Sequence, residues 1–391
     1  MKAPLLSLSR LGEWAHLQAP EESTFTVDNP SDTVTLTKGE RPTMKISTMM
    51  GYAGGFKQAA RDVAEMEKAG LDLVWVAEAY GFDSPSLMGY LAALTERVEI
   101  GAAILPIYTR TPTLIAMTAA GLDALSDGRF HLGLGASGPQ VIEGFHGVPY
   151  TDPLGRTREI VEICRNVWKR EAPLVHQGKN FTLPLPADQG TGLGKPLKII
   201  AHPQRAEIPV WIASLGEKNV QLTAEIADGW IPILFIPERA NDVWGASLAA
   251  GKAKRDAQLG DLMITAGGLL AIGEVDDVVA LRELQRPMVA LYVGGMGARG
   301  KNFYNELAVR YGYEKEAAII QDLYLAGKKR EAEAAVPDEF LELTTLCGPM
   351  GYVKERVAAF RAAGVTHLQV HPLPQSGQSA ASLIESLKTL L

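Results

Sequence analysis

The chain has 391 residues, a formal net charge of -7 and no long run of basic residues. An acidic balance without a basic patch argues against a nucleic-acid-binding surface. Hydrophobic residues make up 47% of the chain, which is enough for one large buried core or two smaller ones.

Cysteine usage and hydropathy bear on the compartment. The two cysteines, Cys164 and Cys347, belong to no CxxC pair, which argues against a structural metal site or a disulfide framework. The N-terminus lacks the apolar core of a signal peptide. The longest apolar stretch, residues 262–272, contains two glycines and is too short to span a membrane. We therefore expect a cytoplasmic protein that binds no metal, no nucleic acid and no membrane.

Residues 1–43 differ in composition from the rest of the chain. They are rich in Ser, Thr, Pro and Glu, and their hydrophobic periodicity is weak. Such a segment buries little apolar surface, so we predict a mobile N-terminal extension. Regular structure is expected from Met44, and residues 44–391 are predicted to form one domain.

From Met44 onward, short apolar runs alternate with amphipathic helices that end at glycine. Apolar runs of this kind are typical of parallel strands that helices cover on both faces. Eight strands are predicted, at residues 44–50, 71–77, 98–105, 129–134, 209–213, 230–235, 263–272 and 365–370. Eight such units in one chain favour a closed (β/α)₈ barrel over a doubly wound sheet.

Two stretches are too long to be simple connections. Residues 172–208 form a loose run rich in proline and glycine before the fifth strand, and residues 286–345 hold a glycine-rich turn followed by helices. Long insertions at the carboxyl ends of barrel strands usually shape the active site. We expect both insertions at that face.

Residues 133–138 satisfy the GxGxxG pattern. A dinucleotide site needs this motif to open a helix, with an acid about 20 residues further on at the end of a second strand. Here Pro139 follows at once, and Asp152 lies in a loop. We favour a barrel strand whose glycines let a flat ring or a phosphate approach the backbone. A tight structural turn remains an alternative.

The segment after the fifth predicted strand has the composition of a phosphate site. Ser214 offers a hydroxyl, Gly216 permits close approach, and Lys218 adds a cation where a helix begins. A helix N-terminus supplies free N–H groups and a partial positive charge. The alternative is that Ser214 only caps this helix.

Small residues and histidines give weaker signals. The end of the third strand, residues 101–106, is rich in small residues that leave room for a planar ligand or simply fill the barrel. None of the seven histidines forms a close ligand pair, so metal chemistry has little support. His131 and His367 lie within strands and are expected to be structural, whereas His146 follows the fourth strand and is the histidine expected to reach an active site.

Several long segments resemble the luciferase-like monooxygenase superfamily. They are similar in particular to its coenzyme F420-dependent oxidoreductases, and the resemblance runs from about Met44 to Leu373. The segments that carry it are residues 74–85, 101–112, 125–150, 212–235 and 294–317.

The resemblance implies a barrel with the cofactor ring at the carboxyl ends of the strands. In relatives the third strand carries a non-proline cis peptide behind the ring, which falls here at Ala103-Ile104. The loop after the fourth strand lies beside the ring, and the turn after the fifth holds the phosphate. The residues implied to bind the cofactor are Glu78, Ala103, Ile104, Gly135, Ser137, Gly138, Ser214, Leu215, Gly216 and Lys218.

Two positions depart from the sugar-phosphate dehydrogenases of this family. Those enzymes have a histidine where this chain has Ala79, and a glutamate where it has Gly138. Sugar-phosphate oxidation is therefore not expected.

Three functions share this barrel and phosphate turn. The first is hydride transfer between coenzyme F420, a deazaflavin, and a small organic substrate. The second is FMN-dependent monooxygenation, and the third is flavin binding without catalysis. Function depends on the site and not on the fold alone. Relatives commonly form homodimers, so the resemblance also implies a homodimer.

Reduction of a carbonyl or a C=C bond needs a proton as well as a hydride. Glu78, at the end of the second strand, is one predicted donor, because apolar surroundings and a flat ring would favour its protonated form. His146 is the other, because imidazole titrates near neutrality. A third interpretation is that Glu78 only hydrogen-bonds the ring or a nearby amide.

Overall fold

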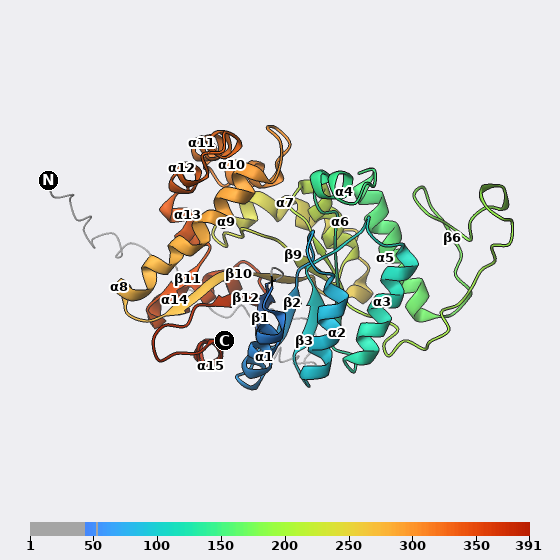
Figure 1. The fold of residues 1–391 in the computed structure, drawn as a ribbon, viewed down its shortest axis with the longest axis horizontal. Helices are drawn as coiled ribbons and strands as arrows, with labels where there is room; N and C mark the ends of the chain where they lie inside the picture. Colours follow the sequence, from blue (N-terminus) through green and yellow to red (C-terminus); the bar gives the residue numbers. More distant parts are fainter. Residues whose placement is uncertain (1–43, 52–53) are drawn as a thin grey trace, which may run out of the picture. The chain divides into compact units, whose positions relative to one another are not determined.

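The structure is a computed structural model that describes residues 44–51 and 54–391. The predicted N-terminal extension lies outside the described residues. Within them, eight parallel strands form a closed barrel that helices surround (Figure 1). The predicted (β/α)₈ barrel is confirmed, and a dinucleotide-binding fold is excluded because residues 133–138 end a barrel strand and enter the loop after it.

All eight predicted strands are present, with shifted ends. In chain order they are β1 (Lys45–Met50), β2 (Leu73–Val76), β3 (Glu99–Ala102), β5 (Phe130–Gly135), β8 (Val210–Ala213), β9 (Gly229–Ile231), β10 (Met263–Ile272) and β12 (His367–Pro372). Each pairs in parallel with the next, and β12 pairs with β1 to close the barrel. The run predicted as one strand at 98–105 is divided, because β3 ends at Ala102 and β4 (Leu105–Pro106) pairs separately with β5.

Helices follow the strands and cover the outside of the barrel. They are α1 (Phe56–Lys68), α2 (Ser84–Leu94), α3 (Pro112–Leu125), α4 (Pro139–Gly144), α5 (Pro153–Lys169), α6 (Glu217–Ile226), α7 (Ala240–Lys252), α14 (Met350–Ala362) and α15 (Ala380–Lys388). Asp83, Thr111 and Asp152 cap the helices that follow them, each with a proline in the first turn. Within the described part of the chain, no helix combines the length and apolarity needed to cross a bilayer.

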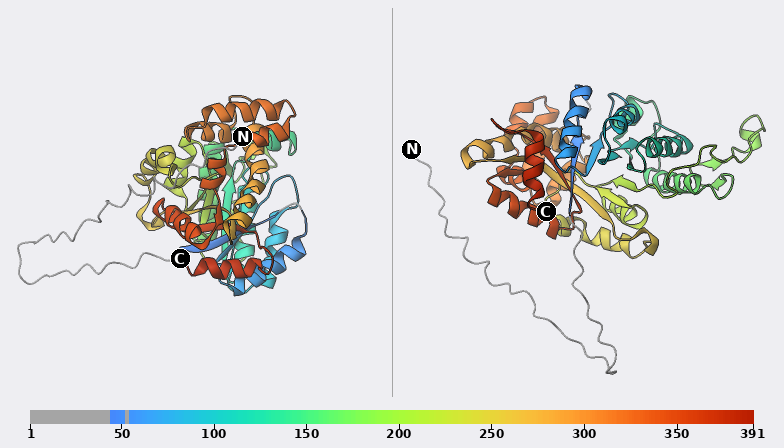
Figure 2. Two further views of the ribbon diagram at one scale, coloured as in Figure 1. Left: turned by 90° about the vertical axis from the view of Figure 1, so that its left-hand side faces the viewer. Right: turned by 90° about the horizontal axis from the view of Figure 1, so that it is seen from below.

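Both predicted insertions are present. The first carries a hairpin, β6 (His176–Gln177) with β7 (Thr182–Leu183), and extends away from the barrel (Figures 1 and 2). The second follows β10 and holds α8 (Val275–Val278), α9 (Arg286–Ala290), a π-helical turn (Leu291–Gly295), α10 (Phe303–Arg310), α11 (Glu314–Leu325), α12 (Lys329–Ala334) and α13 (Asp338–Leu343). It ends in a strand that was not predicted, β11 (Leu346–Gly348), which pairs with the end of β10.

Two tryptophans fill the inside of the barrel. Trp75 of β2 and Trp211 of β8 are fully buried and meet edge to face, with ring centroids 5.0 Å apart. Glycines make room for both rings. A Cβ at Gly101 would lie 2.3 Å from the Trp75 ring, and one at Gly229 would lie 2.1 Å from the Trp211 ring. Gly101 therefore makes room for a side chain that fills the barrel. This agrees with barrel filling, one of the two interpretations of the small residues at the end of the third strand.

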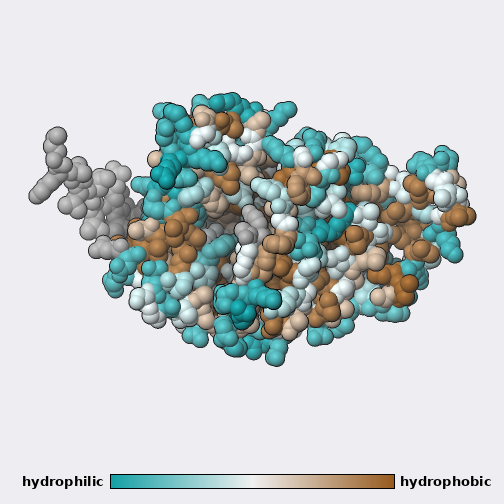
Figure 3. Space-filling view, viewed as in Figure 1, coloured by the Kyte–Doolittle hydropathy of each residue, from teal (hydrophilic) through white to brown (hydrophobic). Residues whose placement is uncertain are grey.

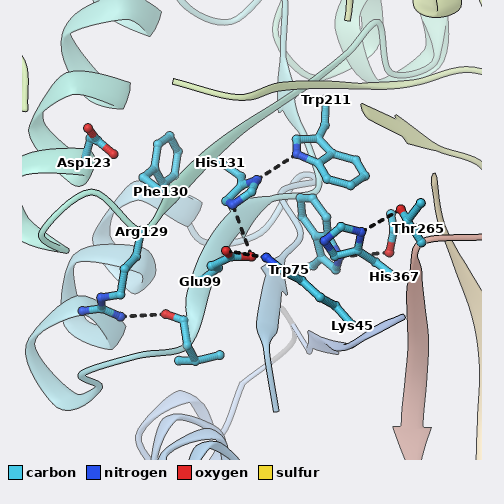
Figure 4. A network of polar contacts seen from close by, with 12 residues as sticks. Lys45, Trp75, Glu99, Asp123, Arg129, Phe130, His131, Trp211, Thr265 and His367 are labelled. Atoms are coloured by element: carbon cyan, nitrogen blue, oxygen red, sulfur yellow. Dashed lines mark hydrogen bonds and ion pairs between the residues drawn. The ribbon is translucent and has the colours of Figure 1, made fainter. Parts of the chain in front are cut away.

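A polar network lies beside these rings at the amino ends of the strands (Figure 4). The Trp211 indole donates to Nδ1 of His131 at 2.9 Å. Because indole N–H only donates, Nδ1 accepts, and the proton of neutral His131 faces Glu99 from Nε2. Lys45 donates to the other oxygen of Glu99 at 2.7 Å. Burial opposes ionisation of Glu99, but the bonds from His131 and Lys45 outweigh it and lower its pKa to about 2. His131 is structural, as expected.

His367 belongs to the same layer and is also structural. Its ring contacts Trp211 edge to face, and its Nδ1 lies 2.9 Å from the Thr366 hydroxyl (Figure 4). Burial, with smaller effects from Lys45 and His131, lowers its pKa from 6.5 to about 3.

The glycine beside Trp75 gives a test of packing. Gly101→Ala should destabilise the protein by roughly 1–3 kcal/mol, because the added Cβ overlaps the buried ring. The matched control is Gly121→Ala in α3, where a Cβ meets nothing within 4 Å; it should stabilise by about 0.5–1 kcal/mol. Urea unfolding measures both, and equal effects would contradict this account of Gly101.

Neutral, buried His367 should make stability depend on pH. A folded pKa of about 3 against 6.5 means that its contribution is complete above pH 6.5 and is lost as the pH falls towards 3. Between pH 6.5 and 5 the loss is at most about 2 kcal/mol. His367→Gln should therefore flatten the fall in unfolding free energy over this interval. The same slope in both proteins would show that other groups cause it.

Candidate functional site

The predicted site residues follow the carboxyl ends of four neighbouring strands. Glu78 follows β2, Ala103 and Ile104 follow β3, Ser137 and Gly138 follow β5, and residues 214–218 follow β8. Parallel strands place all these ends at one mouth of the barrel. The inserted helices α10 to α13, drawn in orange, lie at this same end in Figure 1 and in the left view of Figure 2.

The mouth carries the predicted backbone feature. The peptide bond between Ala103 and Ile104 is cis, as predicted. Both glycines of β5 face this bulge: a Cβ at Gly133 would lie 1.8 Å from the Ala102 carbonyl oxygen, and one at Gly135 would lie 2.6 Å from the Ile104 side chain. These two glycines therefore make room for the neighbouring strand. Their predicted role in the approach of a ring or phosphate to the backbone stays a prediction.

A tyrosine cluster holds the loop after β5. Ser137 adopts a left-handed conformation with φ of 57°, and its carbonyl accepts a hydrogen bond from the Tyr150 hydroxyl at 3.3 Å. Burial raises the pKa of Tyr150, so its phenol keeps the donated proton. Burial, together with the nearby phenols of Tyr292 and Tyr150, raises the pKa of Tyr304 in α10. The loop that holds Ser137 and Gly138 therefore lies close to the inserted helix α10.

The turn after β8 differs from its predicted roles in one respect. The Thr223 hydroxyl donates to the Asn219 carbonyl at 2.8 Å, so its single proton is engaged. Ser214, 2.8 Å from that hydroxyl, must then be the donor to Thr223. Ser214 is 5% exposed and does not cap the helix, since Gly216 is the N-cap residue and no side chain caps it. Its hydroxyl fixes the turn, and its contact with a phosphate stays a prediction.

The start of α6 remains open to a ligand. Gly216 is the N-cap residue, and no side chain caps the helix. A Cβ at Gly216 would meet only the Phe303 ring, at 3.7 Å. Leu215 is held by its carbonyl, which accepts from the Trp244 indole at 3.0 Å, and Lys218 is exposed in the first turn. Free N–H groups and a lysine thus lie together at the mouth.

Glu78 is fixed by partners that the sequence did not reveal. Arg110 donates to both of its oxygens, at 2.6 and 2.9 Å, and the Ser84 amide and hydroxyl donate to one of them at 2.8 and 3.1 Å. The carboxylate and guanidinium side chains are 8% and 14% exposed. This forked, charge-assisted pair engages both carboxylate oxygens, and the role of Glu78 as a proton donor stays a prediction. Glu78 anchors the loop after β2 to the start of α2. Its bond with the Ser84 amide agrees with the interpretation in which Glu78 hydrogen-bonds a nearby amide.

His146 lies on the rim beside this loop. Phe145, its neighbour, contacts Tyr80 with ring centroids 6.1 Å apart, so the loops after β2 and β5 are in contact. Nε2 of His146 is buried and has no hydrogen-bond partner among the described residues. The structure places His146 near the mouth but turns this nitrogen away from open space.

Two polar side chains at the mouth were missed in the sequence. Gln369 and His371 occupy alternate positions of β12 after His367, and they point to the same side of the strand. The sequence carried a signal for them, because polar residues at 367, 369 and 371 alternate with apolar residues. Only His131 and His367 were interpreted as structural, and no role was predicted for Gln369 or His371.

The surface is hollowed where these elements meet. Figure 3 shows a depression between the inserted helices and the strand ends, with hydrophobic side chains inside it. A separate cavity of about 360 Å³ lies between α7 and α14, lined by residues such as Trp230 and Ala359. It contains none of the predicted site residues, so the depression at the strand ends is the candidate site.

Known proteins match this chain over most of its length. The luciferase-like monooxygenase family matches residues 43–367. A candidate coenzyme F420-dependent oxidoreductase of Mycobacterium tuberculosis is 40% identical over 332 residues, which cover 84% of this chain and 94% of that protein.

Solved structures share the fold. An F420-dependent tetrahydromethanopterin reductase from Methanopyrus kandleri has a TM-score of 0.70 at 20% identity, covering 88% of this chain and 97% of that one. A diketocamphane monooxygenase of Pseudomonas putida in complex with FMN has a TM-score of 0.58 at 17% identity, with the same coverage.

The fold and the site define an oxidoreductase-type (β/α)₈ barrel with its ligand end at the carboxyl ends of the strands. The chain belongs to the luciferase-like monooxygenase family.

The pair of Glu78 and Arg110 can be tested by a double-mutant cycle. Glu78→Gln and Arg110→Gln should each destabilise the protein, because each leaves a poorly solvated charged partner. The double variant should recover a coupling energy of about 1–3 kcal/mol in unfolding free energy. Strictly additive losses would contradict a direct interaction.

Proposed function

We propose that this protein transfers a hydride between coenzyme F420 and a small organic substrate. The observation that carries the proposal is the 40% identity to a candidate F420-dependent oxidoreductase over 94% of that protein's length. FMN-dependent monooxygenation is the second candidate, supported by an FMN complex with the same fold.

The residues at the mouth fit a cofactor that carries a phosphate. The uncapped start of α6 would hold this group through backbone N–H donors, with Lys218 as the nearby cation. The approach at Gly216 is open, because even a Cβ there would meet only the Phe303 ring, at 3.7 Å. The buried Oδ1 of Asn219 in the same turn lacks a partner among the described residues. A ligand donor would complete its hydrogen bonding.

The remaining predicted residues would lie around the ring of the bound cofactor. The Ala103-Ile104 bulge and the Ser137-Gly138 loop lie on adjacent strands at the mouth. When bound, the deazaflavin supplies a ring carbon that accepts or donates a hydride. The protein orients the two reactants, and the tryptophan pair closes the barrel beneath them against water.

Cofactor choice tests the proposal directly. The apoprotein is titrated separately with oxidised F420 and with FMN, and cofactor fluorescence is followed. We expect saturable F420 binding that is tighter than FMN binding. Tight FMN binding without detectable F420 binding would overturn the proposal in favour of the monooxygenase.

The N-cap position of α6 separates stability from cofactor binding. Gly216 has φ of -69° and ψ of 145°, which suits an aspartate cap. Gly216→Asp should raise or preserve the melting temperature, because Asp is a preferred cap. The same carboxylate should weaken F420 binding because it occupies the N–H groups and repels the phosphate. We expect a loss of tenfold or more in affinity, which corresponds to about 1.4 kcal/mol of binding free energy.

Gly216→Ala is the matched control for this substitution. Its Cβ adds no charge and meets only the Phe303 ring at 3.7 Å, so cofactor affinity should change little. Unchanged affinity in the Asp variant would mean that α6 does not bind the phosphate.

A further inference from the structure

We infer that Gln369 and His371 form the substrate-binding subsite of the barrel mouth and recognise an uncharged carbonyl or hydroxyl oxygen on an otherwise apolar substrate. The inference rests on the proposed function for its reaction, but the subsite itself rests on the side chains of β12. It assigns a class of substrate that the cofactor alone does not determine.

The orientation of the pair follows from the strand. His367 points into the barrel, since its ring contacts Trp211 with centroids 5.1 Å apart. Leu368 and Val370 are completely buried in the core cluster between barrel and helices. Alternate residues of a strand share a face, so Gln369 and His371 point into the barrel with His367. His371 comes last and lies at the carboxyl end, where β12 pairs with Leu269.

Both side chains are available to a ligand. Other polar groups of the interior are engaged by neighbours: Thr265 is shared by Ser47 and Trp75, and Glu99 binds Lys45. In contrast, Gln369 and His371 make no hydrogen bond with the described part of the chain, and both are only half-buried. Half-buried polar groups without partners usually bind water or a ligand.

The chemistry of the pair is neutral. Burial lowers the pKa of His371, so its imidazole is uncharged at neutral pH and offers one donor and one acceptor. The Gln369 amide offers both kinds of group as well. Such a pair suits a carbonyl, which accepts, or a hydroxyl, which does both.

The walls of the mouth exclude other substrate classes. The side chains packed above the tryptophans are apolar, namely those of Met49, Ala103, Ile104 and Ala213. Two pairs of charged side chains near this space are already formed, Lys45 with Glu99 and Arg110 with Glu78. Among the described residues, Gln369 and His371 themselves offer no charge to pair with a substrate carboxylate or phosphate, and burying an unpaired charge is costly.

His371 also has a place in the reaction. In the oxidative direction, the carbinol C–H bond breaks and its electron pair leaves as hydride to oxidised F420. The O–H bond breaks as its proton passes to the acceptor nitrogen of His371, and the C=O bond forms. The reverse direction returns both. His371 is favoured over His146 because β12 directs His371 into the barrel, whereas His146 lies in the loop after α4 with its Nε2 buried.

The test uses probes that share one apolar body. Binding of cyclohexanone and of cyclohexanecarboxylate to the F420-loaded protein is followed by saturation-transfer NMR at pH 7. We expect the ketone to bind at least tenfold more tightly than the carboxylate. Gln369→Leu and His371→Leu should each weaken ketone binding by about tenfold, the effect of one lost hydrogen bond to an unpaired partner. His371→Gln, which keeps a donor, should recover part of the loss.

Controls separate this subsite from general effects. Affinity for F420 and the melting temperature should be unchanged in all three variants. His202→Leu, at an exposed histidine of the first insertion, should change nothing. In single-turnover hydride transfer with cyclohexanol, His371→Gln should lose at least tenfold in rate beyond its binding loss, whereas His146→Gln should not.

The outcomes distinguish the two proposals. Equal binding of both probes, no binding of the ketone, or unchanged ketone binding in the Leu variants would overturn the subsite even if F420 binds. A rate loss confined to His146→Gln would overturn the proton-transfer role of His371. Should F420 fail to bind while FMN binds, binding of the ketone to the FMN-loaded protein is measured in the same variants. If Gln369→Leu and His371→Leu still weaken that binding, the proposed cofactor is wrong and the subsite stands.

Discussion

The edge-to-face contact between Trp75 and Trp211 is the constraint on which the inside of this barrel depends. Two indoles fill space that layers of smaller side chains usually share in such barrels, so the strands beside them must lack side chains at Gly101 and Gly229. Each indole also needs an acceptor when buried, which Thr265 and His131 supply. The hollow at the mouth begins where these rings end.

The position of charge in the molecule follows from this arrangement. Below the rings, Lys45 and Glu99 form an ion pair near the strand starts, and His131 links that pair to Trp211. On the rim, Arg110 and Glu78 form a second pair outside the hollow. Because each charge has its partner, the wall between the two pairs is neutral. A neutral wall above an aromatic floor favours a flat ring and an uncharged reacting group.

The sequence predicted the fold because strand and helix signals agree along the whole domain. Eight apolar runs separated by helices, several of which have a capping side chain, leave few alternatives to a barrel. The cis bond at Ala103-Ile104 was predictable only from the resemblance. Spacing could not reveal that Gly133 and Gly135 accommodate that bulge, because the contact joins neighbouring strands.

The site was predicted in location more than in chemistry. Positions after β2, β3, β5 and β8 follow from the rule that barrel ligands bind at the strand ends. The partner of Glu78 could not be predicted, because Arg110 is 32 residues away and only the folded loops bring the two side chains together. The hydroxyl of Ser214 was assigned to a ligand because its competitor, Thr223, becomes a neighbour only once α6 forms.

The second insertion completes the mouth through a single helix end. Asn302 caps α10: its oxygen accepts from the Tyr304 and Asn305 amides, and its nitrogen donates to the Tyr292 and Val293 carbonyls, at 2.9 to 3.2 Å. Asn302 is 1% exposed, so these bonds hold the first turn of α10 in one place. That turn carries Phe303 to Gly216 and Tyr304 to Tyr150. The turn after β8 and the loop after β5 belong to different strands, yet both contact the helix turn that this buried asparagine holds.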